Sequence, residues 1–179
     1  MTVVDLGGFW WNWAGRHPQP RHVVVVNLDE KSGVHHPGIE SVQGDACDLP
    51  AAVADTRFDL VYSNSLIEHV GGYAKRRELA RAVSMLADRH WIQTPSRWFP
   101  IEPHWVFPAM QFLPLRLRAA VALHWKRGHV HVEDAEAALA EVLSVELLTA
   151  TEMRHLFPHS ELLIERFAGL RKSLIAVRA

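Results

Sequence analysis

Four consecutive valines at positions 23–26 constrain the fold of this chain more than any other part of its sequence. They form the centre of a segment from His22 to Leu28 in which apolar and polar residues do not alternate. A continuous β-branched run of this kind is typical of a strand that is buried on both faces. Such strands occur in parallel sheets that helices cover, so the run predicts an α/β fold.

Short apolar runs elsewhere supply the other strands of such a sheet, and helical spacing separates several of them. The predicted strands lie at 2–6, 22–28, 39–43, 58–63, 90–93, 161–167 and 173–177. The predicted helices lie at 73–86, at 132–143 and from a cap at Thr149 to Pro158, with Glu152 completing a capping box. The last two strands are joined by a turn that contains Gly169, so we expect them to pair antiparallel.

The chain has 179 residues, which suits a single domain spanning 1–179. The segment 95–131 differs from the rest because prolines and tryptophans are frequent in it. We interpret this segment as a substrate-covering insertion, a loop followed by one or two short helices laid over the sheet.

Charge and cysteine usage exclude several classes of protein. Nineteen Lys and Arg residues nearly balance 20 Asp and Glu residues, so no general attraction to nucleic acid is expected. Cys47 is the single cysteine, which excludes an internal disulfide and fits a reducing compartment. The sequence contains neither a signal peptide nor an apolar run of membrane-spanning length. We therefore expect a cytoplasmic protein without stable membrane insertion.

Polar residues and glycines follow four of the predicted strands where each strand ends. These ends carry 5–8, Asn27 with Asp29, 44–46, and Asn64 with Ser65. In open α/β sheets ligands bind beyond the carboxyl ends of the strands, so these segments are the candidate site.

The same segments resemble motifs of the class I S-adenosylmethionine-dependent methyltransferases, in the right order. Residues 3–8 (VVDLGG) resemble the first motif, and 44–50 (GDACDLP) resemble the segment that meets the adenine. Residues 58–70 (FDLVYSNSLIEHV) are similar to the fourth-strand motif of the type 11 subgroup, which methylates small molecules and lipids. Residues 147–178 resemble the closing helix and hairpin.

This resemblance implies a Rossmann-like three-layer sandwich around a mostly parallel seven-stranded sheet with an antiparallel C-terminal hairpin. It also implies S-adenosyl-L-methionine as the cofactor and methyl transfer to a small-molecule, sugar or lipid acceptor. The residues that it assigns to the cofactor are Asp5, Gly7 and Gly8 at the methionine part, Asn27 or Asp29 at the ribose, Asp45 and Ala46 at the adenine, and Asn64 at the other edge.

The first motif departs from the family pattern at two positions. Phe9 and Trp11 stand two and four residues after Gly7, where the family usually has further glycines. Either these rings fill the space for the methionine part, or they stack on the cofactor, whose sulfonium an aromatic face would stabilise. A catalytically inactive binding or regulatory protein of the same fold is therefore the alternative function. A nicotinamide-dependent enzyme is a weaker one, because Gly-x-Gly-x-x-Gly is absent.

Two histidines are the candidate catalytic residues. His69 follows the fourth predicted strand, near the expected position of the transferred methyl group, and it could accept a proton from the acceptor. His104, with Glu102, follows the fifth strand and is a weaker candidate base. The other reading is that His69 only fixes its turn and that 102–104 is a solvated loop. No Cys/His cluster completes a metal site, so we expect no metal. An uncovered sheet face would favour a homodimer.

Overall fold

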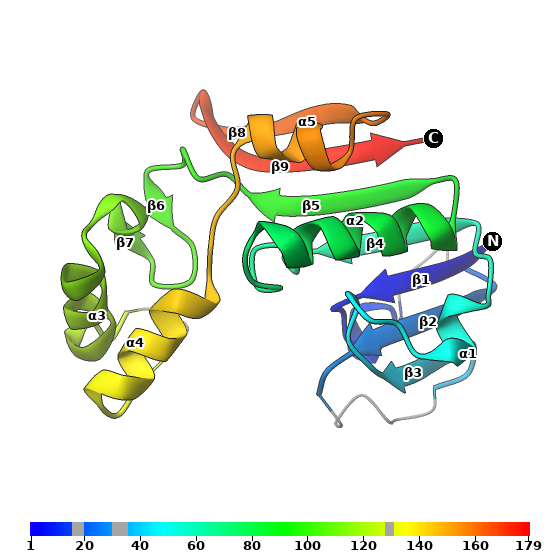
Figure 1. Cartoon of the computed structure of the whole chain (residues 1–179), viewed down its shortest axis with the longest axis horizontal. Helices are drawn as coiled ribbons and strands as arrows, with labels where there is room; N and C mark the ends of the chain where they lie inside the picture. The colour runs from blue at the N-terminus through cyan, green and yellow to red at the C-terminus, as the bar shows by residue number, and fades with distance from the viewer. Residues whose placement is uncertain (16–19, 30–35, 128–130) are drawn as a thin grey trace.

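The computed structural model describes residues 1–15, 20–29, 36–127 and 131–179, and its main element is a seven-stranded sheet (Figure 1). Across the sheet the strands are β3 (Ile39–Gln43), β2 (His22–Asn27), β1 (Thr2–Leu6), β4 (Leu60–Asn64), β5 (His90–Pro95), β9 (Leu170–Arg178) and β8 (Glu161–Phe167). The first five pair parallel, and β9 lies antiparallel between β5 and β8. The predicted mostly parallel sheet with an antiparallel C-terminal hairpin is confirmed.

The order of the strands reverses between β1 and β4, since the chain runs outward to β3 before it returns to β4. This reversal is a topological switch point, where a crevice opens beyond the carboxyl ends of the strands. The segments after β1 and β4 meet at that crevice.

Three helices cover one face of the sheet: α1 (Ala51–Ala54), α2 (Tyr73–Leu86) and α5 (Ala150–Leu156). Leu79, Val83 and Leu86 of α2 are buried against Val61 and other apolar residues of the strands in the main core. The capping box at Thr149 and Glu152 begins α5 as predicted, because each side chain accepts a hydrogen bond from the other residue's backbone. Figure 1 shows α2 lying along β4 and β5.

Tryptophans cover part of the opposite face. The connection from β1 to β2 contains only a short 3-10 helix, η1 (Trp10–Asn12), within its described residues. Trp10 and Trp13 pack against the apolar residues that β1 and β2 present on this face, among them Val3 and Val25. Aromatic rings bury a large area per residue, so two of them shield strands that a crossover helix would otherwise cover.

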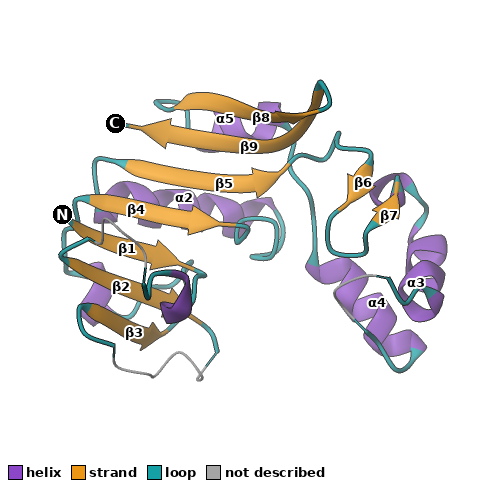
Figure 2. Ribbon diagram, turned by 180° about the vertical axis from the view of Figure 1, so that it is seen from behind, coloured by secondary structure: helices purple, strands orange, loops and turns teal. Residues whose placement is uncertain are grey.

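The segment after β5 folds into a separate helical unit. It contains β6 (Ile101–Glu102), β7 (Phe107–Pro108), η3 (Met110–Phe112), α3 (Leu115–His124) and then α4 (Ala135–Ser144). Ala122 of α3 and Ala138 and Val142 of α4 are buried in one small cluster. Figures 1 and 2 show the α3–α4 pair beyond the carboxyl ends of the strands, not over a face of the sheet as we expected. The reason is that α3 packs against α4, where Ala122 is buried beside Ala138 and Val142. Among the described helices, none has the length and apolar character required to cross a membrane.

Candidate functional site

The turn after β1 is shaped by two glycines at the crevice. Gly7 has φ of +82°, a backbone conformation that glycine adopts without strain, and its N–H donates to the carbonyl of Val26 at 2.8 Å. A Cβ atom on Gly7 would lie 2.8 Å from Cδ1 of Leu66, which follows β4. The turns after β1 and β4 therefore approach each other closely at Gly7.

Asn27 ties the turn after β1 to the end of β2. Its side-chain amide donates to the carbonyl oxygens of Gly7 at 3.3 Å and Gly8 at 2.9 Å. Its Oδ1 accepts the backbone N–H of Asp29 at 3.0 Å. The Asn27 side chain thus holds the turn after β1 to the end of β2, and Asp29 is exposed at the same strand end.

Asp5 is buried at the end of β1 and binds the aromatic segment. Its Oδ2 accepts a hydrogen bond from Nε1 of Trp13 at 2.7 Å. A Cβ atom on Gly8 would collide with the Asp5 carboxylate, so Gly8 is required by this packing. The Asp5–Trp13 hydrogen bond holds the aromatic segment against the strand end.

A cavity of about 260 Å³ lies beside this turn, and it shows where the bulky residues point. Phe9 is among its lining residues, whereas Trp11 is not. Trp11 is 50% exposed and stacks on Phe9 with ring centroids 4.3 Å apart. The lining residues are Asp5, Gly7, Gly8, Phe9, Asn12, Trp13, Tyr62, Asn64 and Ser65. Phe9 therefore forms a wall of an open space instead of filling it.

A second cavity, of about 210 Å³, lies on the other side of Gly7. Its walls are mostly apolar, and Asp45, His69 and Lys75 are the titratable residues among them. Oδ1 of Asp45 accepts the backbone N–H of Cys47 at 2.8 Å, which orders the turn after β3. The lining residues are Gly7, Val26, Asn27, Leu28, Gly44, Asp45, Ala46, Leu66, His69, Val70 and Lys75. A larger surface hollow, of about 710 Å³, lies between α2 and α5, and none of the predicted site residues lines it.

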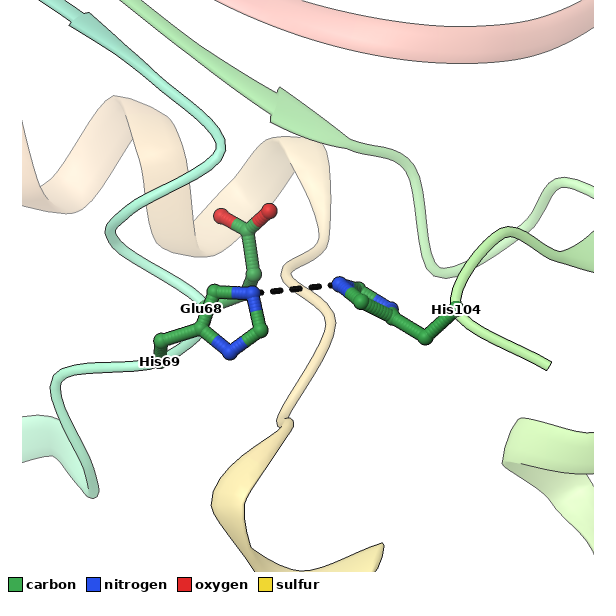
Figure 3. A group of neighbouring side chains, drawn as sticks. All are labelled: Glu68, His69 and His104. Atoms are coloured by element: carbon green, nitrogen blue, oxygen red, sulfur yellow. Dashed lines mark hydrogen bonds between the residues drawn. The ribbon is translucent and has the colours of Figure 1, made fainter. Parts of the chain in front are cut away.

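His69 meets His104 across the crevice (Figure 3). Their Nε2 atoms lie 3.1 Å apart, although the residues belong to different segments of the chain. Nδ1 of His104 lies 2.6 Å from Oε1 of Glu102, whose Oε2 accepts the backbone N–H of Trp105 at 2.8 Å. Glu68, beside His69, is fully buried, and its Oε2 accepts the Thr94 hydroxyl at 2.9 Å.

The two imidazoles differ in acidity. Burial, helped by the charge of His104, lowers the pKa of His69 to about 4, so its ring is neutral at neutral pH. Burial also acts to lower the pKa of His104, but the hydrogen bond and charge of Glu102 outweigh it, and the pKa is raised. Burial raises the pKa of Glu68.

The structure thus brings the predicted residues together in one crevice. Asp5, Gly7, Gly8 and Asn64 line the first cavity, and Asn27, Asp45, Ala46 and His69 line the second. His104 contacts His69. Asp29 is exposed two residues after Asn27 and lines neither cavity.

Sequence reasoning missed Glu68 and Trp13 as members of the site. Glu68 had one visible signal, since it is a carboxylate that follows two apolar residues and stands directly before the candidate His69. Trp13 had none, because its hydrogen bond to Asp5 depends on the path of the connection after β1.

Comparisons with known proteins agree with this geometry. Residues 8–88 match a family model described as a methyltransferase domain, of type 11. Among solved structures, an S-adenosylmethionine-dependent methyltransferase from Listeria monocytogenes has a TM-score of 0.58 at 14% identity, covering 99% of this chain and 91% of its own. No curated protein matches the chain.

Two further solved structures are similar in fold. An O-methyltransferase family protein from Burkholderia thailandensis has a TM-score of 0.59 at 18% identity, covering 99% of this chain and 51% of its own. Magnesium protoporphyrin IX methyltransferase from Synechocystis PCC 6803, solved with bound SAH, has a TM-score of 0.56 at 12% identity, covering 99% of this chain and 74% of its own.

Proposed function

We propose that this chain, whose family model and fold are those of the class I S-adenosylmethionine-dependent methyltransferases of type 11, transfers a methyl group from that cofactor to a small-molecule acceptor. The observation that carries the proposal is a pair of cavities that share Gly7 at the topological switch point. One is mostly apolar with a carboxylate at its edge, and the other is bordered by aromatic rings. This division suits a ligand with a nucleoside at one end and a charged amino acid at the other.

The second cavity fits the adenosine half of the cofactor. Val26, Leu28 and Ala46 provide apolar surface for a purine ring, and Asp45 stands at the edge where an adenine amino group would donate a hydrogen bond. We assign the ribose hydroxyls to Asp29, because its exposed side chain follows Leu28 at the carboxyl end of β2, and Leu28 lines this cavity.

The first cavity fits the methionine half. Phe9, Trp13 and Tyr62 line it, and aromatic faces stabilise cations such as a sulfonium. Asn64 and Ser65 add polar groups at the end of β4. In this assignment Phe9 replaces the usual second glycine by contacting the cofactor.

The bound cofactor supplies an electrophilic methyl group on its sulfonium, and the protein's task is to align the acceptor and to remove its proton. When the His104 ring is neutral, Glu102 holds its proton on Nδ1, and Nε2 of His104 can accept a hydrogen bond from Nε2–H of His69. Nδ1 of His69 is then unprotonated.

Proton removal is assigned to Nδ1 of neutral His69 as the acceptor atom bonds to the methyl carbon and the carbon–sulfur bond breaks. The positive charge that His69 gains is stabilised by the negative charge of the Glu102 carboxylate, as long as the His104 ring between them stays neutral. This requires an acceptor atom that carries both a lone pair and a proton, as the oxygen of a hydroxyl group or the nitrogen of a neutral amine does.

The segment 95–131 forms the acceptor side of the site in this proposal. It brings His104 to the crevice and contributes Arg97 and Arg118 to a cavity of about 210 Å³ behind Glu102. We propose that this unit, within a single domain, closes over the acceptor. A cytoplasmic location fits this function, because the cofactor is made there.

Titration calorimetry with S-adenosylmethionine tests the proposal. We expect saturable binding that is lost in Asp45→Ala and kept in Asp55→Ala, which removes an exposed carboxylate outside both cavities. Absence of binding at millimolar cofactor would reject the function. Cofactor binding without methyl transfer to any acceptor would instead support the non-catalytic alternative.

A further inference from the structure

We propose that Glu68, His69 and His104 form a binding site for a divalent transition-metal ion. One ligand atom from each of the three side chains lies within 4.8 Å of the others. Figure 3 shows Glu68 and His69 on the turn after β4 and His104 on the segment after β6, with the two imidazole rings facing each other. Such a set offers two imidazole nitrogens and one carboxylate oxygen.

His104 is held in the form that a metal ligand requires. Because Nδ1 of His104 donates to buried Glu102 at 2.6 Å, its Nε2 carries a lone pair directed at His69. Glu102 is fixed in turn by the backbone N–H of Trp105. A carboxylate that orients a histidine in this way is the usual outer partner of a metal-bound imidazole.

The burial of Glu68 supports the metal site independently of the two histidines. Its side chain is fully buried, and Thr94 binds only one of its two oxygens. Among the described residues, no group meets the distance and angle of a hydrogen bond to the other oxygen, Oε1, although the Ser65 hydroxyl lies near the carboxyl group. A buried carboxylate oxygen without a partner is costly, and a cation beside it would remove that cost.

The spacing of the nitrogens suits a first-row transition metal. With metal–nitrogen bonds of about 2.0–2.1 Å, Nε2 atoms 3.1 Å apart subtend an angle of about 100° at the ion. That angle lies between those of octahedral and tetrahedral coordination. Two imidazoles with one carboxylate favour Zn²⁺, Co²⁺ or Fe²⁺ over Mg²⁺ or Ca²⁺, which prefer oxygen ligands.

Three protein ligands leave positions open for a further group. His69 lines the cavity assigned to the cofactor, so an open position would face the reacting centre. Only this consequence rests on the proposed function: an acceptor oxygen bound to the ion would lose its proton more readily. With the ion bound, the His69 proton moves to Nδ1 and both histidines act as ligands, so the proton of the acceptor oxygen passes to solvent water.

The test is a titration of the purified full chain with Co²⁺, followed by its visible absorption bands and by calorimetry. We expect one ion per chain, with bands typical of a mixed nitrogen and oxygen site, and displacement by Zn²⁺. His69→Ala and His104→Ala should each weaken binding at least ~10-fold. His159→Ala is the matched control, because it removes an exposed histidine outside the cluster, and it should leave binding unchanged.

Glu68→Gln keeps the size of the side chain and provides a further variant if a histidine change impairs folding. It should lower Co²⁺ affinity while circular dichroism remains native. If the wild type and all cluster variants bind Co²⁺ equally, the ion is an adventitious one on surface histidines, and the proposal is overturned. Absence of Co²⁺ binding by the wild type would also overturn it. Measuring S-adenosylmethionine binding on the same samples separates this failure from failure of the proposed function.

Discussion

Asn27→Ala is expected to destabilise the protein before any ligand is added. The Asn27 side chain makes three hydrogen bonds, two to the carbonyls of Gly7 and Gly8 and one from the backbone N–H of Asp29. The change removes all three hydrogen bonds, including the two that connect the turn after β1 to the end of β2. A residue whose only task was to bind ribose would have no such effect on the free protein.

The size of the effect follows from those three bonds. A net contribution of about 0.5–1 kcal/mol each is appropriate, because the site is partly buried and water can replace some of the lost partners. The free energy of unfolding should therefore fall by about 1.5–3 kcal/mol. For a domain of this size that corresponds to a melting temperature lower by about 3–12 °C.

Urea denaturation of the cofactor-free protein, followed by circular dichroism, measures this change. Asn12→Ala is the matched control, since Asn12 is exposed and its loss should cost under about 0.5 kcal/mol. If Asn27→Ala unfolds with the wild-type midpoint but binds S-adenosylmethionine more weakly, the turn-holding role is refuted and the ribose role that the sequence also allowed is supported.

Three further predictions concern the aromatic wall, pH and assembly. Phe9→Ala should weaken S-adenosylmethionine binding about 2- to 30-fold by calorimetry, the range of a lost cation–π contact, and a tighter complex would show that Phe9 obstructs the site. Trp11→Ala should have the smaller effect, because Trp11 stacks outside the cavity. Burial, with the charge of Arg178, lowers the pKa of His90 to about 4. As the pH falls, His90 is therefore protonated at a higher pH in the unfolded chain than in the folded protein, so the free energy of unfolding should fall between pH 6.5 and pH 4. His90→Gln should reduce this pH dependence in a series of denaturation curves. Sedimentation equilibrium should detect a homodimer, and a purely monomeric protein at high concentration would reject that prediction.

The parts of the fold that the sequence predicts are those that local patterns determine. The run at 23–26 identified β2 because strand formation and two-sided burial both follow from consecutive β-branched residues. The capping box at Thr149 and Glu152 identified the start of α5 because both partners lie within one helical turn. Predicted strand ends differ from the observed ones by a few residues, since pairing with neighbouring strands decides where a strand begins and ends.

Long-range contacts account for what the sequence did not predict. The pairing of α3 with α4 away from the sheet depends on which residues of the two helices come into contact, and the spacing of apolar residues along one helix does not specify the element that it packs against. The contact between His69 and His104 joins segments 35 residues apart and depends on the path after β5. Each histidine was selected for its own position, whereas their combination with buried Glu68 became visible only in three dimensions.

A crystal structure of this chain with bound S-adenosylhomocysteine would test the proposed cofactor site most directly. We predict that the adenine lies in the cavity lined by Leu28 and Asp45, with the ribose hydroxyls at Asp29. The amino acid part should lie beside Phe9, Trp13 and Tyr62. The sulfur should lie near Gly7, where the two cavities meet. Ligand density elsewhere, or crystals grown with saturating ligand in which both cavities hold only water, would contradict it.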